Sequence, residues 1–413
     1  MSRPAVALVG TLDTKGAEYQ WVAGRLDDLG VDPVVVDAGI RPPAGFTGAV
    51  AVGQDAVARA AGTTVQALRD GDDRGAAVTA MGEGAAAVLA GLAAGGRLDG
   101  VLALGGSGGS SIAARAVRDL PVGLPKLIVS TMASGDVSPY VGASDVTMMY
   151  SVVDIAGVNR VSRTVLGNAA AAIAGMAAAH ATAATGAGEV ERPLVAASMF
   201  GVTTPAVDAA RARLEELGYE VLVFHATGSG GRALEALARS GMLAGVLDLT
   251  TTELADDLVG GVLSAGPARL TAAGAAGVPQ VVSLGALDMV NFGPEETVPA
   301  EFAGRTFFVH NPTVTLMRTT AAENAELGRR LGGKLAAAAG PTVLVVPRGG
   351  VSALDAEGAA FHDPAADAAL FAAALEAVAG SDVTVLDSPR HVNDPALAVE
   401  AADRLHRLVT KEA

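Results

Sequence analysis

The sequence predicts an α/β protein made of two Rossmann-like doubly wound domains with mainly parallel sheets and an interdomain cleft. Short apolar runs bounded by glycine alternate with helical patterns along the chain, which is typical of parallel strands covered by helices on both faces. At 413 residues the chain exceeds the size at which a single core stops growing. The pattern also restarts: Arg25–Gly30 (RLDDLG) precedes one strand as Arg213–Gly218 (RLEELG) precedes another.

In the first half of the chain, each apolar run ends at a polar or glycine-containing turn, and helical periodicity follows. The expected strands are Ala5–Val9, Pro33–Val36, Gly100–Leu104 and Lys126–Val129. The expected helices are Ala17–Leu29, Gln54–Ala61, Val65–Leu68, Gly75–Ala94, Ser110–Arg118 and Ile155–Ala181. The alanine-rich end of the last helix is nearly long enough for a membrane span, but alanine is barely apolar and His180 lies near its end, which favours a buried helix.

A small, polar, glycine-containing stretch then separates the two halves. We predict a nucleotide-binding domain over residues 1–183, a linker over 184–192 and a second domain over 193–413, the site of a substrate or partner. In the second domain the expected strands are Leu194–Ser198, Glu220–Phe224, Val246–Leu249, Gln280–Leu284, Thr306–Val309 and Thr342–Val346. The expected helices are Pro205–Leu217, Gly231–Ser240, Thr315–Ala338, Ala365–Ala379 and Pro395–Val409.

Charge and composition exclude several classes of function. The formal net charge of −15 repels phosphate backbones, so we expect no nucleic-acid partner, although a small anion can bind where local N–H groups and basic side chains override the global field. The absence of cysteine excludes thiolate chemistry and fits a reducing compartment. Because the apolar run at the N-terminus is too short for a secretion signal, we expect a cytoplasmic protein without a membrane partner.

A glycine- and serine-rich turn between an expected strand and helix is the main candidate for a phosphate site. Four glycines leave backbone N–H groups open to an oxyanion, serines add hydroxyl donors, and the helix N-terminus adds its positive end. A tight strand-to-helix turn is the alternative, but it requires only one or two glycines. The turn is neither a dinucleotide fingerprint nor a Walker A loop. Its candidate residues are Gly105, Gly106, Ser107, Gly108, Gly109 and Ser110.

Two further turns are expected at the same edge of the sheet, because ligands of open parallel sheets bind at the carboxyl ends of strands. In the first turn Thr11 and Lys15 suit a phosphate, and Asp13 could hold Mg²⁺ through water, although helix capping alone explains the threonine and the aspartate. After the fourth strand, more hydroxyl groups and a glycine follow. They are Ser130, Thr131, Ser134 and Gly135.

The second domain also gathers polar side chains at strand ends. His225 opens a glycine-rich turn, and His310, Glu253 and Asp288 follow other strands, so these four residues are candidates for acid–base chemistry. No spacing typical of a metal site supports a metal there. The last turn, Pro347–Ser352, has the composition of another anion-binding loop.

Several of these motifs resemble the family named for a plant tobamovirus-resistance protein, the Tm-1-like ATP-binding proteins. The resemblance rests on Val9–Gly16 (VGTLDTKG), Gly105–Ser111, Ser130–Asp136, Asp154–Met176 and turns of the second half, so it spans nearly the whole chain. It implies a pair of Rossmann-like domains, ATP bound with Mg²⁺ in the first, and a homodimer. The implied ATP contacts are Thr11, Asp13, Lys15, the Gly105–Ser110 loop and Ser130–Gly135.

Three functions remain open at this point. The first is an ATP-dependent enzyme, by phosphoryl transfer or ATP hydrolysis, that acts on a small anionic metabolite in the interdomain cleft. The second is a non-catalytic ATP-binding module that engages a protein partner, as plant members of the family do with a viral replication protein. The third is an ATP-independent isomerase or lyase whose first-domain loop binds the phosphate of its substrate.

Overall fold

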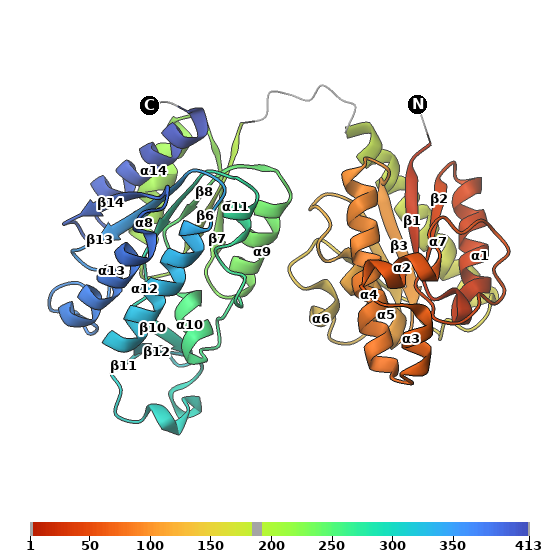
Figure 1. The fold of residues 1–413 in the computed structure, drawn as a ribbon, viewed down its shortest axis with the longest axis horizontal. Helices are drawn as coiled ribbons and strands as arrows, with labels where there is room; N and C mark the ends of the chain where they lie inside the picture. The colour runs from red at the N-terminus through yellow and green to blue at the C-terminus, as the bar shows by residue number, and fades with distance from the viewer. Residues whose placement is uncertain (1–2, 184–191, 412–413) are drawn as a thin grey trace. The chain divides into compact units, whose positions relative to one another are not determined.

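The computed structural model describes residues 3–183 and 192–411, and it divides into two compact units (Figure 1). Unit 1 ends at Glu189 and unit 2 begins at Val190. The linker expected over 184–192 lies outside the described residues, except for Arg192.

Unit 1 is a five-stranded parallel sheet with the strand order β2-β1-β3-β4-β5. Its elements are β1 (Ala5–Gly10), α1 (Leu12–Asp28), β2 (Asp32–Asp37), α2 (Gln54–Ala60), α3 (Val65–Asp70), α4 (Arg74–Ala94), β3 (Gly100–Gly105), α5 (Ser107–Val117), β4 (Lys126–Ser130), α6 (Ser138–Val141), β5 (Thr147–Tyr150) and α7 (Arg160–Ala183). Because β1 lies between β2 and β3, the chain reverses its direction of winding between β1 and β3, and open α/β sheets bind ligands at this point.

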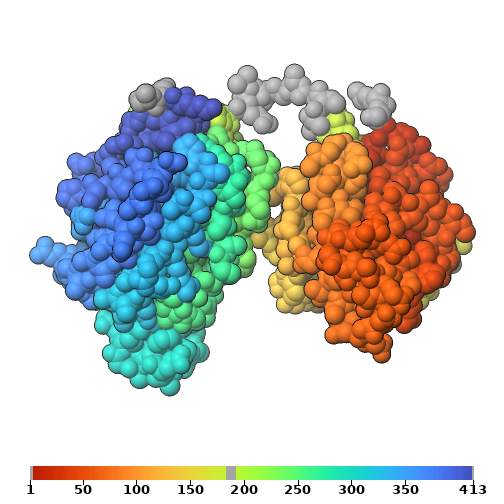
Figure 2. Space-filling model, in the orientation of Figure 1, coloured from red at the N-terminus to blue at the C-terminus, as the bar shows by residue number. Residues whose placement is uncertain are grey.

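Alternating side chains of the strands explain why both faces of this sheet are covered. On β1, Ala7 and Val9 pack into the core beneath α2, α4 and α5, whereas Val6 and Leu8 pack into the core beneath α1 and α7. Figure 1 shows these two helical layers, and in Figure 2 the side chains of α4 and α5 cover the near face of the unit. The expected sandwich of helices around a parallel sheet is confirmed.

Tyr19 of α1 fixes the carboxyl ends of β1 and β3. Its buried hydroxyl donates to the Val9 carbonyl at 2.5 Å and accepts from the Leu104 N–H at 2.8 Å, just beyond the last paired residues of the two strands. A side chain at Gly10 would place its Cβ 1.9 Å from this hydroxyl. Glycine is therefore required at position 10. Burial also raises the pKa of the Tyr19 hydroxyl above its ordinary value.

Unit 2 is a six-stranded parallel sheet with the order β14-β13-β9-β8-β6-β7, accompanied by the antiparallel sheet β10-β12-β11. Its elements are β6 (Leu194–Met199), α8 (Thr204–Glu216), β7 (Glu220–His225), α9 (Ser229–Arg239), β8 (Leu243–Asp248), α10 (Glu253–Val259), α11 (Ala272–Ala275), β9 (Gln280–Ser283), β10 (Met289–Phe292), the 3₁₀ turns η1 (Glu295–Thr297) and η2 (Ala300–Phe302), β11 (Phe307–Asn311), β12 (Val314–Arg318), α12 (Ala321–Ala336), β13 (Thr342–Pro347), α13 (Pro364–Val378), β14 (Thr384–Ser388) and α14 (Pro395–Thr410).

The opening strands of unit 2 repeat the topology of unit 1. In chain order its first five parallel strands are arranged 2-1-3-4-5, as in unit 1, with β14 added at the edge. Helices α8 and α14 pack on one face, and α10, α12 and α13 pack on the other. The similarity of the two sequence halves therefore reflects two sheets wound in the same order.

The segment that precedes α12 is a strand and not part of the helix, so the helix predicted from Thr315 is wrong at its start. Val314–Arg318 is β12, the central strand of the antiparallel sheet. The helix begins only after Thr320, whose hydroxyl accepts from the Glu323 N–H while the Glu323 carboxylate accepts from the Thr320 N–H. Pairing with β10 and β11, which are distant in the sequence, decides the structure of this segment.

Two helices of unit 1, α4 and α7, are long and apolar enough to cross a membrane by length and composition. Met81 and Leu89 of α4 pack into one core of the unit, and Leu166 and Ile173 of α7 pack into the core on the opposite face. These side chains of α4 and α7 are apolar because they pack in the cores on the two faces of the unit 1 sheet.

We predict that Tyr19→Phe destabilises unit 1 by about 1–3 kcal/mol, because the Leu104 N–H and the Val9 carbonyl lose a buried partner. Urea unfolding followed by the fluorescence of Trp21, the only tryptophan of the chain, measures this unit. Tyr140→Phe is the matched control, since that side chain is only half-buried. An unchanged urea midpoint in the Tyr19 variant would contradict the prediction.

Candidate functional site

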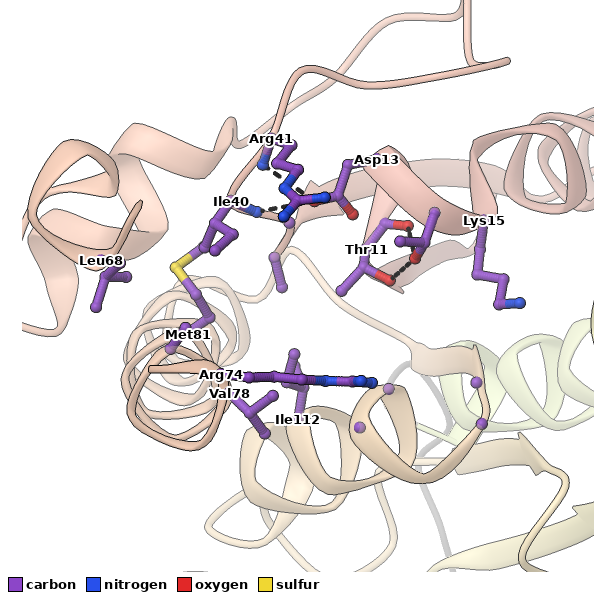
Figure 3. A pocket seen from close by; sticks show the side chains of 18 of the residues that line it. Thr11, Asp13, Lys15, Ile40, Arg41, Leu68, Arg74, Val78, Met81 and Ile112 are labelled. Atoms are coloured by element: carbon purple, nitrogen blue, oxygen red, sulfur yellow. Dashed lines mark hydrogen bonds between the residues drawn. The ribbon is translucent and has the colours of Figure 1, made fainter. Parts of the chain in front are cut away.

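A cavity of about 590 Å³ opens at the carboxyl end of the unit 1 sheet (Figure 3). It combines the turn between β1 and α1 with the turn between β3 and α5, which are almost a hundred residues apart in the sequence. The segment after β2 and the start of α4 complete its wall. The cavity therefore lies at the point where the winding of the sheet reverses.

The glycines of the β3–α5 turn serve two different purposes. A Cβ at Gly105 would lie 2.7 Å from the Gly109 Cα, so Gly105 permits the close packing of α5 on β3. A Cβ at Gly108 would meet nothing closer than 3.6 Å, and one at Gly106 nothing closer than 3.8 Å. Both positions line the cavity, so packing within the unit does not explain these two glycines.

Helix α5 starts at Ser107, three residues earlier than expected, so most of the glycine turn is the first turn of the helix. The Ser110 N–H donates back to the Gly106 carbonyl. Within the described part of the chain, the N–H groups of Ser107, Gly108 and Gly109 donate to no protein group. Three free donors at the positive end of a helix form an anion-binding arrangement.

An arginine that the sequence did not single out lies beside this helix start. Arg74, the first residue of α4, extends across the cavity (Figure 3), and its Nη2 lies 3.6 Å from the Cβ position of Gly108. In residues 3–183 and 192–411, the Arg74 guanidinium has neither a hydrogen bond nor an ion pair. Arg41 and Arg69 also line the cavity. Arg74 could not be found from local sequence, because only the fold brings α4 to α5.

Three site residues were expected in the first turn, and two of them, Asp13 and Thr11, line the cavity with hydrogen-bonding capacity to spare. Asp13 accepts from the Ile40 and Arg41 N–H groups through Oδ2, at 3.2 and 3.0 Å, while its buried Oδ1 has no partner among the described residues. The Thr11 hydroxyl forms a hydrogen bond with the Thr14 hydroxyl at 2.6 Å. By contrast, the Lys15 Nζ donates to the carbonyl of Ile155, so this lysine is directed away from Arg74 (Figure 3).

The turn after β4 contributes less to the cavity than expected. The hydroxyls of Ser110 and Ser130 are buried and bond to each other at 2.6 Å, and they tie α5 to β4. Thr131 lies beside Gly106, 3.8 Å from its Cβ position. Ser134 and Gly135 are exposed, and neither lines the cavity.

Part of the cavity lining is apolar. Ile40, Leu68 and Met81 lie together on segments that also carry the three arginines (Figure 3), and Val78 lies beside Gly108 of the glycine turn. The site thus combines an anion-binding end with an apolar surface.

In unit 2, the glycine-rich turn after β7 already holds a carboxylate of the protein. The Gly228 and Gly231 N–H groups donate to Glu253 Oε1 at 2.7 and 3.1 Å, and the fully buried Arg269 donates to Oε2 at 2.6 Å. A group with all its partners supplied and no exposed surface does not reach a substrate. His225 lies at the mouth of this turn, exposed, with its ring 5.5 Å from that of Phe200.

The other two acid–base candidates of unit 2 lie on separate elements. Asp288 follows β9, is fully buried, and accepts from the Ser352 hydroxyl at 2.6 Å, and burial raises its pKa to about 6. His310 is exposed on β11. Among the described residues, no three His, Asp or Glu side chains are grouped so that they could hold a metal ion.

Two doubly wound parallel sheets, with a glycine-lined cavity at the winding reversal of the first, define a Rossmann-like α/β protein. Residues 4–182 match the N-terminal domain and residues 192–409 the C-terminal domain of the uncharacterised protein family UPF0261, and the chain belongs to this family. A UPF0261 protein of Clostridium tetani is 48% identical over 98% of this chain and 99% of its own length.

The resemblance to the plant family is also confirmed. The tomato ToMV resistance protein Tm-1(GCR237) is 47% identical over 74% of this chain and 41% of its own length. Among solved structures, UDP-N-acetylglucosamine 2-epimerase from Rickettsia bellii is 10% identical, with a TM-score of 0.21 over 68% of this chain and 78% of that one.

We predict that alanine at two glycines of the β3–α5 turn has opposite effects on stability. Gly105→Ala destabilises unit 1 by about 1–3 kcal/mol through the clash with Gly109. Gly108→Ala stabilises it by up to about 1 kcal/mol, because the added methyl faces the cavity in a helical turn. Urea unfolding followed by Trp21 fluorescence compares both variants, and equal effects would contradict this division of roles.

We also predict a pH dependence from Asp288. Its folded pKa of about 6 exceeds the ordinary value of 3.8, so the folded state retains a proton that the unfolded chain releases. The contribution of Asp288 to stability is therefore present at pH 4 and is lost as the pH rises through 6. Hydrogen exchange measures the protection of the β9–β10 peptides. Over this pH range the protection should fall less in Asp288→Asn than in the exposed control Asp382→Asn. The same slope in both would refute this.

Proposed function

We propose that unit 1 binds a nucleotide, ATP with Mg²⁺, in the cavity between the β1–α1 and β3–α5 turns. The observation that carries this proposal is the Arg74 guanidinium beside Gly108 at the start of α5, where neither it nor the N–H groups of Ser107, Gly108 and Gly109 have a partner among the described residues. Two groups of positive potential repel each other unless an anion lies between them. A phosphate, which accepts hydrogen bonds in several directions, suits both.

The rest of the cavity is consistent with the other parts of a nucleotide. The apolar wall of Ile40, Leu68 and Met81 would pack against the base. The buried Asp13 Oδ1, which has no partner among the described residues, suits a hard cation such as Mg²⁺, held directly or through water. Bound there, Mg²⁺ would neutralise phosphate charge. The resemblance to the Tm-1-like ATP-binding proteins supports ATP over other nucleotides.

Use of the bound ATP is a further step of this proposal. Phosphoryl transfer depends mainly on positioning and charge neutralisation, and Arg74, Arg41 and the α5 N–H groups would supply both to the transferred phosphate of an ATP-dependent enzyme. A non-catalytic ATP-binding module would need the same cavity but no turnover. An ATP-independent enzyme for a phosphorylated metabolite would use only the anion-binding end.

We predict that Mg²⁺-ATP stabilises unit 1 by about 2.7 kcal/mol at 100 times its Kd. Trp21 fluorescence during thermal or urea unfolding measures this shift, and inorganic phosphate and a sugar phosphate serve as comparison ligands. Arg74→Ala and Gly108→Ala should each weaken ATP binding at least about tenfold. The first removes a charge-assisted contact, and the second places a methyl group in the cavity.

Arg163→Ala is the matched control, since Arg163 is an exposed arginine of unit 1 outside the cavity. No shift with Mg²⁺-ATP would disprove nucleotide binding, and an equal shift with a sugar phosphate would favour the ATP-independent enzyme. Release of ADP and phosphate, measured with a panel of sugar acids, separates the enzyme from the non-catalytic module.

A further inference from the structure

Lys15 lines the unit 1 cavity but binds a group that does not line it (Figure 3). Its Nζ donates to the carbonyl of Ile155, which lies 140 residues further along the chain, between β5 and α7. Thr11, Asp13 and Thr14 of the same turn also line the cavity. The side chain of Lys15 therefore connects the cavity with the segment that follows β5.

Residues 152–156 of that segment have few other ties to unit 1. In the described part of the chain, the Lys15 bond is the one hydrogen bond that joins them to any residue beyond the adjacent Ser151. Ile155 also packs in the core beneath α1 and α7. Val152 is 58% exposed, and its φ of 65° lies in the left-handed region, which is unfavourable for a β-branched residue. Such a conformation persists only where its surroundings hold it, so loss of the Lys15 bond would loosen the segment.

The positive charge of Lys15 is not balanced where it lies. In residues 3–183 and 192–411, its ammonium has no ion pair, and the Ile155 carbonyl is its one hydrogen-bond partner. A carbonyl carries no net charge, and a cation in the first turn of a helix lies near the positive end of the helix dipole. An ammonium has three N–H donors, so two remain. A phosphate in the cavity would add the attraction of opposite charges, which the carbonyl lacks.

Glu18, one turn further along α1, holds the end of the same segment. Its Oε1 accepts from the Gly157 N–H at 2.6 Å, and the residue is buried. Glu18 does not line the cavity, so this contact does not depend on a ligand there. The segment would therefore stay attached to α1 at Gly157 when Lys15 leaves Ile155.

We propose that a bound nucleotide draws the Lys15 ammonium from the Ile155 carbonyl to a phosphate oxygen, and that residues 152–156 loosen as a result. This inference rests on the nucleotide site proposed for unit 1. One hydrogen bond breaks and another forms, with no covalent change. Lys15 thus transmits the occupancy of the cavity to a surface segment outside it.

The test is hydrogen exchange of the full chain with and without Mg²⁺-ATP, resolved into peptides. ATP should slow exchange at the start of α5, because a phosphate accepts from the free N–H groups there. It should speed exchange of residues 152–156 about two- to tenfold, the range expected for the loss of one hydrogen bond.

Lys15→Met keeps the length of the side chain but removes the ammonium. Without ATP, residues 152–156 of this variant should already exchange about two- to tenfold faster than in the unmodified chain, and ATP should speed them no further. ATP should still slow exchange at the start of α5, with binding weakened about tenfold by the lost charge-assisted contact. Glu18→Gln is the matched control: it retains an acceptor for the Gly157 N–H, and its residues 152–156 should respond to ATP as in the unmodified chain.

Two results would show that Lys15 is a structural contact only and would overturn the proposal. One is an unchanged exchange of residues 152–156 when ATP slows the start of α5 in the unmodified chain. The other is an ATP response of these residues that survives in Lys15→Met. If ATP changes neither exchange at the start of α5 nor the unfolding of unit 1, the nucleotide site itself is disproved, and this inference fails with it.

Discussion

The hydroxyl of Tyr19 links the carboxyl ends of the two strands on which the unit 1 site depends. It bonds to Val9 and Leu104 where the ladder between β1 and β3 ends, and it requires glycine at position 10. From these strand ends the turns into α1 and α5 leave in opposite directions, one to each face of the sheet. The cavity is the space between them, so its position follows from one buried hydrogen-bonded group and the strand order.

The two units share a strand order but treat their glycine-rich turns differently. In unit 1 the first N–H groups of α5 and the neighbouring Arg74 have no partner within the part of the chain that the structure describes. In unit 2 the N–H groups at the start of α9 are satisfied by Glu253, which is itself held by the buried Arg269. A carboxylate of the chain thus takes the place that an external anion could take. A common fold therefore does not give the two units a common site.

Local charge, more than the net charge of −15, sets what each cavity can accept. Three arginines and three aspartates line the unit 1 cavity, and one of the arginines, Arg74, lies beside the start of α5. A second cavity, of about 510 Å³, lies after β13 in unit 2. At this cavity, Arg348 is paired with Asp387, and Asp355 and Asp367 share Arg318. The first arrangement favours a phosphate, whereas these charged groups of the second are already paired within unit 2.

The sequence by itself determined the elements whose signal is local. Apolar runs ended by polar or glycine-containing turns located most strands of the two parallel sheets, and the glycines around Gly105 marked the turn that lines the cavity. Only the tertiary structure decided that Val314–Arg318 is a strand, that Arg74 reaches α5, and that Glu253 fills the turn after His225. Each of these depends on partners far away in the chain. Side-chain periodicity reports which face of an element is buried, but it does not report which distant group lies against that face.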